Sequence, residues 1–254
     1  MKIKTRIRRM ALAGTAAMAF TVMASPANAV VGGQAAAAGQ FPYTLALLNN
    51  GTYTCGATLI GPSKAITAAH CVDGLLAGRL TVRADSLQPT SGGQTERLSQ
   101  VVIHPEYSSL DLANDIAVLR LARDLPAVNV PALLPPQGPP PSGKAFVVGY
   151  GANKAGATFP NPRSKVSVQL ISNPACQEAY GSDVTDSTVC GGTAGQGACT
   201  GDDGGPVADP LGRTVLGIIS WGAKSTPGSQ SCGNPGQPDV YTNLSSYTNW
   251  ISSV

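Results

Sequence analysis

The chain has 254 residues, of which 43% are apolar and only 12% are charged, against roughly 25% charged residues in an average soluble domain. This composition excludes a disordered or polyelectrolyte chain, and the length suffices for one large domain or two smaller ones with real cores. The 30 glycines and 20 prolines indicate many turns and short elements. Long helical bundles and coiled coils are therefore disfavoured.

The first 29 residues are typical of a secretory signal peptide. Five basic residues within the first nine positions precede an apolar stretch at 10–24, and Ala27-Asn28-Ala29 forms an A-x-A cleavage site. The apolar stretch is shorter than the roughly 20 residues that a membrane-spanning helix needs. We therefore expect a secreted, extracellular protein that has no membrane attachment once the signal is removed.

The formal net charge of +3 depends on this leader. Without residues 1–29 the chain has 12 basic and 14 acidic side chains, which gives a net charge of −2. A basic surface that binds nucleic acid is therefore not expected.

Six cysteines form an even set in a chain bound for an oxidising compartment, which favours three disulfides. The alternative, a zinc site, lacks a CxxC pair, and the chain has only two histidines, His70 and His104. We expect no bound metal and no cofactor. Six cysteines allow 15 pairings, so their number alone does not give the connectivity.

Short β-rich runs bounded by turn residues recur from Phe41 onward. A first series lies at 43–48, 58–60, 65–68, 80–83, 98–104 and 116–121, and a second at 145–149, 165–172, 206–208, 215–221 and 239–242. This repetition predicts an all-β sandwich or barrel.

The two series are separated by residues 131–143, which contain six prolines in thirteen positions. Proline lacks the N–H donor that a central strand needs, so we expect an extended linker between two β-units. Residues 173–180 are predicted to form a short helix. Residues 245–254 are predicted to form a C-terminal helix packed back on the body, because Tyr247, Trp250 and Ile251 have helical spacing.

Three segments carry residue types suited to serine-nucleophile chemistry: Thr67-Ala68-Ala69-His70-Cys71, Asn114-Asp115-Ile116-Ala117-Val118-Leu119 and Cys199-Thr200-Gly201-Asp202-Asp203-Gly204-Gly205-Pro206. Val30-Val31-Gly32-Gly33, Gly149-Tyr150-Gly151 and Ser220-Trp221-Gly222 accompany them. In this order and spacing, the segments resemble the chymotrypsin/trypsin family of secreted serine peptidases. The resemblance covers residues 30–254. It implies two six-stranded antiparallel barrels, at about 30–130 and about 144–254, with the active cleft between them.

The family's mechanism needs a His that takes the proton of the nucleophile, an Asp that orients the His, and backbone N–H groups that bind the oxyanion. The resemblance assigns these roles to His70, to Asp115 and to the N–H groups of Gly201 and Asp203. Asp203, however, stands where the family's GDSGGP segment carries the nucleophilic Ser.

The carboxylate of Asp203 is a poor substitute for a serine hydroxyl. Its attack on an amide would give a mixed anhydride, which is a poor intermediate. Its charge would also repel an oxyanion about 4 Å away by roughly 4 kcal/mol at an effective dielectric of 20. We therefore expect the chain to be a proteolytically inactive homologue.

Other features follow from the same resemblance. It implies the disulfides Cys55–Cys71, Cys176–Cys190 and Cys199–Cys232. In the family, a newly cut terminal ammonium pairs with the Asp that precedes the nucleophile, here Asp202. Cleavage after Ala29 would make Val30 that terminus, with no propeptide left to remove.

The substrate pocket departs from the trypsin pattern. Gly197, six positions before Asp203, stands where trypsins place the acid that selects Lys and Arg. Asp239 matches another position at the base of this pocket and could accept a basic side chain at a different depth; a solvent-exposed Asp239 is the alternative. The walls match Ser220, Trp221 and Gly222, and the loop at 223–237 is longer than is usual in the family, which would narrow the mouth.

Three functions therefore remain open. The first is an inactive homologue, expected to be monomeric, that binds peptides, proteins or protease inhibitors. The second is a hydrolase with residual or unusual activity. The third, a metal-binding module built from His70, Asp115 and Asp203, is disfavoured because the first two normally bond each other.

Asn50 and Asn243 begin N-glycosylation sequons, which are meaningful only in a eukaryotic secretory host.

Overall fold

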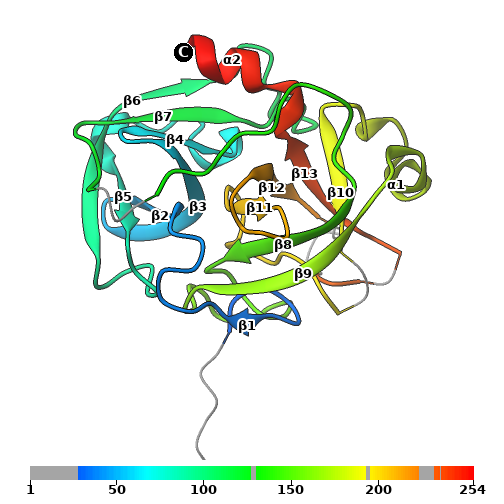
Figure 1. The fold of residues 1–254 in the computed structure, drawn as a ribbon, viewed down its shortest axis with the longest axis horizontal. Coiled ribbons are helices and arrows are strands. Elements are labelled where there is room, and N and C mark those ends of the chain that lie inside the picture. Colours follow the sequence, from blue (N-terminus) through cyan, green and yellow to red (C-terminus); the bar gives the residue numbers. More distant parts are fainter. Residues whose placement is uncertain (1–27, 127–129, 193–194, 223–231, 235) are drawn as a thin grey trace, which may run out of the picture.

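A computed structural model describes residues 28–126, 130–192, 195–222, 232–234 and 236–254. These residues form two closed six-stranded antiparallel β-barrels that lie side by side, with short helices at the periphery (Figure 1). The all-β, two-barrel architecture expected from the sequence is confirmed. Within the described ranges, none of the helices has the length and apolar character required to cross a membrane.

The first barrel closes in the order β2-β3-β4-β7-β6-β5. Its strands are β2 (Thr44–Asn49), β3 (Thr52–Gly61), β4 (Lys64–Thr67), β5 (Leu80–Ala84), β6 (Gln94–Ile103) and β7 (Ala117–Leu121). Asn50 and Gly51 join β2 to β3 with φ values of 49° and 82°. Two positive φ values are typical of the tight hairpin turn whose twist matches that of the strands. The alternating burial along β5 reflects one side chain in two pointing into the barrel core.

The second barrel closes through the pairing of β8 with β9. Its strands are β8 (Gly143–Gly149), β9 (Ser164–Ile171), β10 (Thr188–Gly191), β13 (Asp239–Asn243), β12 (Val215–Trp221) and β11 (Pro206–Ala208). The short strand β1 (Gln34–Ala35) adds to β9. The strand series expected from the sequence lacks β1 and β10, which are two and four residues long.

The C-terminal residues return from the second barrel to the first. The predicted helices are present as α1 (Asn173–Tyr180) and α2 (Thr248–Ser253), and 3-10 turns lie at Ala69–Cys71, Ala77–Arg79, Gly181–Asp183 and Leu244–Ser246. Tyr247 and Ile251 are buried in the core of the first barrel, and Lys64 Nζ donates a 2.8 Å hydrogen bond to the Ile251 carbonyl. The end of the chain therefore fastens the two barrels together.

The proline-rich segment also touches both barrels. The N–H of Ala132 donates to the Leu59 carbonyl in the first barrel, and the N–H of Leu133 donates to the Arg213 carbonyl in the second. Its last residue, Gly143, already belongs to β8. The linker is therefore hydrogen-bonded to both barrels where they meet.

Three disulfides join Cys55 to Cys71, Cys176 to Cys190 and Cys199 to Cys232, and the described residues contain no free cysteine. These are the pairs that the family resemblance implies. Closing a loop of about 15 residues contributes on the order of 3 kcal/mol in the chain-entropy view. The first bridge ties β3 to the turn that carries His70, so it also fixes the site.

Candidate functional site

His70 and Asp115 meet because β4 and β7 pair as antiparallel neighbours. His70 lies in the turn after β4, and Asp115 lies just before β7, so both emerge at the same edge of the barrel. His70 Nδ1 lies 2.7 Å from Asp115 Oδ2, and the backbone N–H of His70 donates to Oδ1 at 2.9 Å. Two bonds to one carboxylate fix both the position and the tautomer of the imidazole.

Two groups of the second barrel hold Asp115 from the other side. Ser220 Oγ donates to Asp115 Oδ2 at 2.5 Å, and Thr242 Oγ1 donates to the Asp115 carbonyl at 2.8 Å. Sequence reasoning placed Ser220 in the pocket wall and missed this bond. The side chain of Ser220 instead connects β12 to the His70–Asp115 pair across the junction of the barrels.

The charges around His70 favour its protonated form. Burial by itself lowers the pKa of His70, but the hydrogen bond and charge of Asp115, with the charge of Asp203, outweigh burial and raise the pKa above 6.5. His70 remains 26% exposed, whereas Asp115 is buried. The imidazole therefore faces the cleft with a carboxylate behind it and a second one nearby.

Asp203 lies in the turn that precedes β11 and is held by both barrels. Its carbonyl accepts a 2.7 Å hydrogen bond from the N–H of Gly56 in β3, and the next residue, Gly204, donates to the Ile219 carbonyl. A Cβ on Gly56 would lie 2.7 Å from the Cα of Gly205, so only glycine allows this approach. Hydrogen bonds to both barrels therefore hold the Asp203 segment where the barrels meet.

Two hydrogen bonds fix the orientation of two peptide groups in this segment. The carbonyl of Thr200 accepts from the N–H of Ala152, and the carbonyl of Asp202 accepts from the N–H of Gly205. Because N–H and C=O point in opposite directions in a trans peptide, the N–H groups of Gly201 and Asp203 are aimed away from those partners.

Tyr53 fixes the peptide between these two N–H groups. Its buried hydroxyl donates to the Gly201 carbonyl at 2.6 Å, and its ring packs edge-on against Tyr150, with centroids 6.0 Å apart. Burial raises the pKa of Tyr53 well above its ordinary value, so the hydroxyl keeps its proton. Sequence reasoning missed Tyr53, because only the folded chain brings it to Gly201.

The carboxylate of Asp203 lies close enough to His70 and Asp115 to interact with both electrostatically. The backbone N–H of Asp203 also acts electrostatically on this carboxylate. Burial raises the pKa of Asp203 to about 6, although the charge of His70 and this N–H act in the opposite direction and the charge of Asp115 adds to the rise. His70 therefore has a second carboxyl group near it, in addition to Asp115.

Asp202 is fully buried behind the cleft. It accepts hydrogen bonds from the N–H of Gly151 at 2.7 Å and of Cys199 at 2.9 Å. Gly149 and Gly151 make room for it, since a Cβ on either would lie within 2.7 Å of the carboxylate. Burial raises the pKa of Asp202 well above its ordinary value.

The amino-terminal segment beside this site is buried as well. Ala29 and Val30 are both fully buried, and Val31 pairs with Gly197. Residues 1–27 of the expected signal peptide lie outside the described residues. Because the chain is continuous through Ala29, Val30 carries an amide rather than an α-ammonium in this structure.

Asp239 is a buried residue with two glycines beside its carboxylate. It is 7% exposed, which excludes the solvent-exposed alternative. A Cβ on Gly197 would lie 2.3 Å from Asp239 Oδ2, and one on Gly222 would lie 3.2 Å from Oδ1. The absence of a side chain at Gly197 therefore makes the space that the Asp239 carboxylate fills.

Two neutral hydrogen-bond donors contact the Asp239 carboxylate. It accepts from the N–H of Ala198 at 2.6 Å and from the Tyr241 hydroxyl at 3.3 Å. Burial raises the pKa of Asp239 to about 7; these two bonds lower it, and the charge of Asp203 raises it further.

Trp221, another residue expected in the pocket wall, packs edge-on against Tyr180 at a centroid distance of 4.9 Å. Most of the long loop expected at 223–237 lies outside the described residues.

Two further expectations concern modification and metals. Asn50 is exposed in the β2–β3 turn, but Asn243 is fully buried and its amide bonds to Asp186 and Ser245, so this folded structure does not allow glycosylation at Asn243. Among the described residues, the group with metal-ligand spacing is Cys55, His70 and Cys71. Its two sulfurs form a disulfide and offer no thiolate ligand.

Replacing Asp203 with Asn should lower the free energy of unfolding more at pH 5 than at pH 8. The pKa of Asp203 is about 6 in the fold against an ordinary 3.8. The folded wild type therefore binds extra protons between these values and loses stability as the pH rises through this window. The raised pKa of His70 acts in the same direction at higher pH. We expect a difference of about 2 kcal/mol between the two pH values.

Urea unfolding of wild type and Asp203→Asn at both pH values measures this difference. Asp124→Asn, an exposed acid outside the site, is the control and should show no such trend. Parallel stability curves for wild type and Asp203→Asn would mean that the Asp203 carboxylate is not perturbed by its surroundings.

Comparison with known proteins places the chain in a family. Residues 30–251 match the family model "Trypsin". The chain is 35% identical to Trypsin-1 of Astacus astacus, covering 88% of this chain and 99% of the relative, and 35% identical to Trypsin Blo t 3 of Blomia tropicalis, covering 87% and 84%. Mouse neuropsin, a serine protease of solved structure, superposes with a TM-score of 0.77 at 30% identity over 87% of this chain and 97% of neuropsin. The chain belongs to the trypsin family of chymotrypsin-like serine peptidases.

Proposed function

We propose that this protein is a secreted, proteolytically inactive member of the trypsin family that binds peptides, proteins or protease inhibitors presenting a Lys or Arg side chain. The observation that carries the proposal is Asp203, a carboxylate at the nucleophile position beside the His70–Asp115 pair. Loss of the nucleophile in a serine peptidase lowers turnover by roughly 10⁶-fold. The proposal therefore separates recognition, which needs the pocket, from bond cleavage, which needs the missing hydroxyl.

The charge of the cleft supports a basic ligand. The proposal assigns Asp239 to the base of the substrate pocket and Asp203 to its mouth; the two carboxylates interact electrostatically. A cationic side chain entering the pocket relieves this repulsion and finds two charge partners. A protein that binds a substrate and its transition state equally tightly gains affinity for the substrate but does not accelerate the reaction.

A second candidate function is a hydrolase with residual or unusual activity. The 2.7 Å bond between His70 and Asp115 keeps this candidate open, because the general base of the family remains in place. Relatives of this chain carry the name trypsin. Asp203, however, needs no general base, so an intact His70 would add nothing to its reactivity.

The proposal includes removal of residues 1–29 on secretion. Val30 would then begin the mature chain, and its α-ammonium would pair with Asp202. This idea is supported by the burial of Val30 and by the pairing of Val31 with Gly197, which hold the new terminus beside the cleft.

Asp203→Ser should convert the protein into an active peptidase. It restores a hydroxyl beside His70 and frees the N–H of residue 203 for the oxyanion. The measurement is turnover of a library of peptide amides by purified wild type, Asp203→Ser and Asp203→Ser/His70→Ala. We expect activity in the single variant alone, and Asp203→Ser/Asp239→Ala should lose its preference for Lys and Arg.

The same assay can overturn the proposal. Wild-type amidase activity that survives repurification and disappears in His70→Ala would establish the second candidate instead. No activity in Asp203→Ser would mean that the cleft no longer supports the family's chemistry.

Affinity for benzamidine, a small aromatic cation, should rise by about tenfold between pH 6 and pH 8 as Asp239 ionises. The pKa of this carboxyl is about 7 in the fold, so its charged form becomes dominant across this interval. Calorimetric titration at both pH values measures the change. Asp239→Asn should bind weakly at both, while Asp124→Asn should match the wild type. Undiminished binding by Asp239→Asn would place the cation elsewhere.

A chain that begins at Val30 should keep its stability at pH 8 better than a chain that retains Ala29. In the longer chain, ionisation of buried Asp202 has no ammonium to offset it, so stability falls as the pH rises. We expect the difference between the two chains to grow by about 1–3 kcal/mol from pH 5 to pH 8. Urea unfolding measures it, and Asp202→Asn should abolish it. Amino-terminal sequencing of the secreted protein should start at Val30; a later start would rule out the ion pair.

A further inference from the structure

Two cysteines and a histidine meet at the edge of the candidate site. Cys55 lies in β3, and His70 and Cys71 are adjacent in the 3-10 turn that follows β4. The ligand atoms of these residues, two sulfurs and one imidazole nitrogen, all lie within 4.8 Å of one another. In the oxidised protein the two sulfurs form a disulfide. A protein with this bridge reduced would instead present two thiols beside an imidazole.

The ring nitrogen of His70 that does not contact Asp115 faces one of these sulfurs. His70 Nε2 lies 3.6 Å from Cys71 Sγ. In a tetrahedral zinc site, Zn–S bonds of about 2.3 Å and Zn–N bonds of about 2.0–2.1 Å place the two ligand atoms roughly 3.5 Å apart. The observed separation therefore fits a Zn²⁺ ion bound to both atoms.

Asp115 holds His70 in the way that zinc proteins hold a ligating histidine. Its carboxylate lies 2.7 Å from His70 Nδ1 and also accepts a 2.9 Å hydrogen bond from the backbone N–H of His70. A carboxylate at one ring nitrogen fixes the tautomer and the ring orientation, which leaves the other nitrogen free to bind a metal. Asp115 thus supports a metal ion at Nε2 without contacting it.

The backbone keeps the three ligands together by contacts other than the disulfide. β3 and β4 are antiparallel neighbours. Thr67 Oγ1, at the end of β4, donates at 2.8 Å to the carbonyl of Gly56, which follows Cys55. The N–H of Cys71 donates to the Ala68 carbonyl at 3.2 Å. Because none of these bonds involves a sulfur, we expect the ligands to stay close to one another after reduction.

We propose that reduction of the Cys55–Cys71 disulfide creates a Zn²⁺ site whose protein ligands are Cys55, His70 and Cys71. Two molecules of a thiol reductant supply two electrons and two protons, are oxidised to their own disulfide and leave two cysteine thiols. Zn²⁺ then binds both sulfurs and displaces the two thiol protons. Two cysteines and one histidine, with water in the fourth position, are a known zinc ligand set. The 26% exposure of the His70 side chain leaves an open side for that water.

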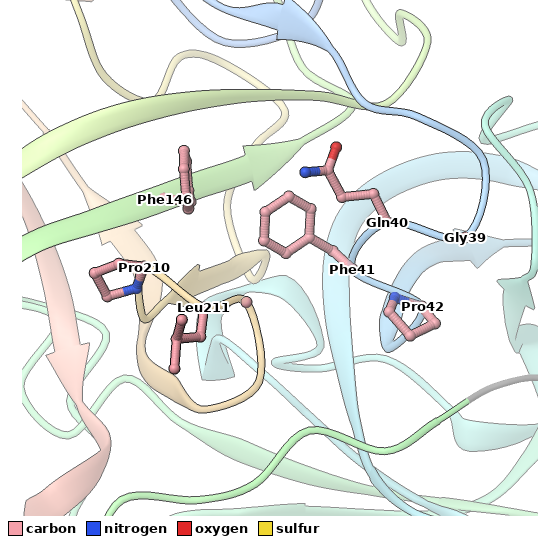
Figure 2. Close-up of a pocket in the computed structure, with 8 residues that line it drawn as sticks. Gly39, Gln40, Phe41, Pro42, Phe146, Pro210 and Leu211 are labelled. Atoms are coloured by element: carbon pink, nitrogen blue, oxygen red, sulfur yellow. The ribbon is translucent and has the colours of Figure 1, made fainter.

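Other parts of the described chain offer no comparable ligand set. Within the described ranges, no second group of three Cys, His, Asp or Glu side chains lies as close together. The hollow in Figure 2, where the start of β2 meets β8 and the β11–β12 turn, has none of these residue types among the eight residues that line it. His104, the other histidine of the chain, packs edge-on against Tyr247 and Trp250. Zinc bound by the reduced protein is therefore expected at His70.

The test uses purified protein that is reduced anaerobically with a phosphine, because thiol reductants themselves bind zinc. Zn²⁺ is titrated in competition with a chromogenic chelator, and Co²⁺ is titrated in parallel. We expect the reduced protein to bind one equivalent of Zn²⁺ and the oxidised protein to bind none at this site. Bound Co²⁺ should show thiolate charge-transfer absorption and the visible spectrum of a tetrahedral ion.

Variants of the ligands identify the site. Cys55→Ser/Cys71→Ser should abolish the Co²⁺–thiolate absorption and the tight binding of Zn²⁺. Asp115→Asn should weaken Zn²⁺ binding by about 10–100-fold, because it removes the partner that orients His70. His70→Ala removes a ligand itself, so it should weaken Zn²⁺ binding more than Asp115→Asn.

Two matched controls separate this site from the rest of the chain. The phosphine also reduces the other bridges, so Cys176→Ser/Cys190→Ser removes a second pair of thiols away from His70. His104→Ala removes the other imidazole. Both variants should bind Zn²⁺ as tightly as the reduced wild type.

Stability gives a readout that does not depend on spectroscopy. Near-ultraviolet circular dichroism reports whether the reduced chain is folded, and urea unfolding measures its stability. A metal that binds the folded state stabilises it. Zn²⁺ should therefore stabilise the reduced wild type, and it should have no such effect on Cys55→Ser/Cys71→Ser.

Three outcomes would overturn the proposal. Reduced wild type that binds no Zn²⁺ would exclude the site. Tight binding that persists in Cys55→Ser/Cys71→Ser or in His70→Ala, or that is lost in Cys176→Ser/Cys190→Ser, would place the ion elsewhere. A reduced chain that is unfolded and that Zn²⁺ does not refold would also count against the site, because binding at native ligands contributes free energy to folding.

Discussion

The concentration of carboxylates at the junction of the two barrels is the constraint on which the site depends. Asp115, Asp202 and Asp239 are all less than 10% exposed, and Asp203 joins them at the surface of the cleft. Removing a carboxylate from water is costly unless donors replace the lost hydration. The fold supplies these donors almost entirely from backbone N–H groups and hydroxyls, and among the described residues His70 is the side chain that can bring a positive charge next to Asp115 and Asp203.

This need for donors explains the unusual demands on the backbone around the site. Gly149 and Gly151 have no side chains because Asp202 fills the space beside them, and Gly197 has none because Asp239 does. Ser220 and Thr242 cross from the second barrel to Asp115, which belongs to the first. The interface between barrels is therefore held by the same bonds that arrange the site. A change in any of these partners would disturb barrel packing and chemistry together.

Much of this arrangement could be predicted from the sequence because it follows local signals. The segments around His70, Asp115 and Asp203 are short, contiguous and ordered; the strand pattern predicted an all-β sandwich or barrel, and the resemblance that these segments carry implied two barrels. The α1 helix lies at the residues predicted for it. These features depend on neighbours along the chain, and such signals survive without knowledge of the tertiary structure.

The features that sequence reasoning missed depend on distant partners. Tyr53 reaches the Gly201 carbonyl from 148 residues away, and Ser220 reaches Asp115 from 105 residues away. The burial of Asn243, which removes its sequon from solvent, results from packing of β13 between β10 and β12. The two-residue strand β1 forms only because β9 offers an edge to pair with. In each case the sequence permits the feature, and a contact between barrels or strands decides it.

The substitution at position 203 changes what the same framework can stabilise. With a hydroxyl there, the N–H groups of Gly201 and residue 203 would be open to negative charge that develops during a reaction. Asp203 instead brings a carboxyl group with a pKa of about 6, whose charge, when ionised, acts on Asp239. A cation entering the cleft lowers the pKa of both carboxyls, so its binding is coupled to the release of protons. Under the proposed function, the framework that stabilises a transient anion in an active serine peptidase would here stabilise a bound cation.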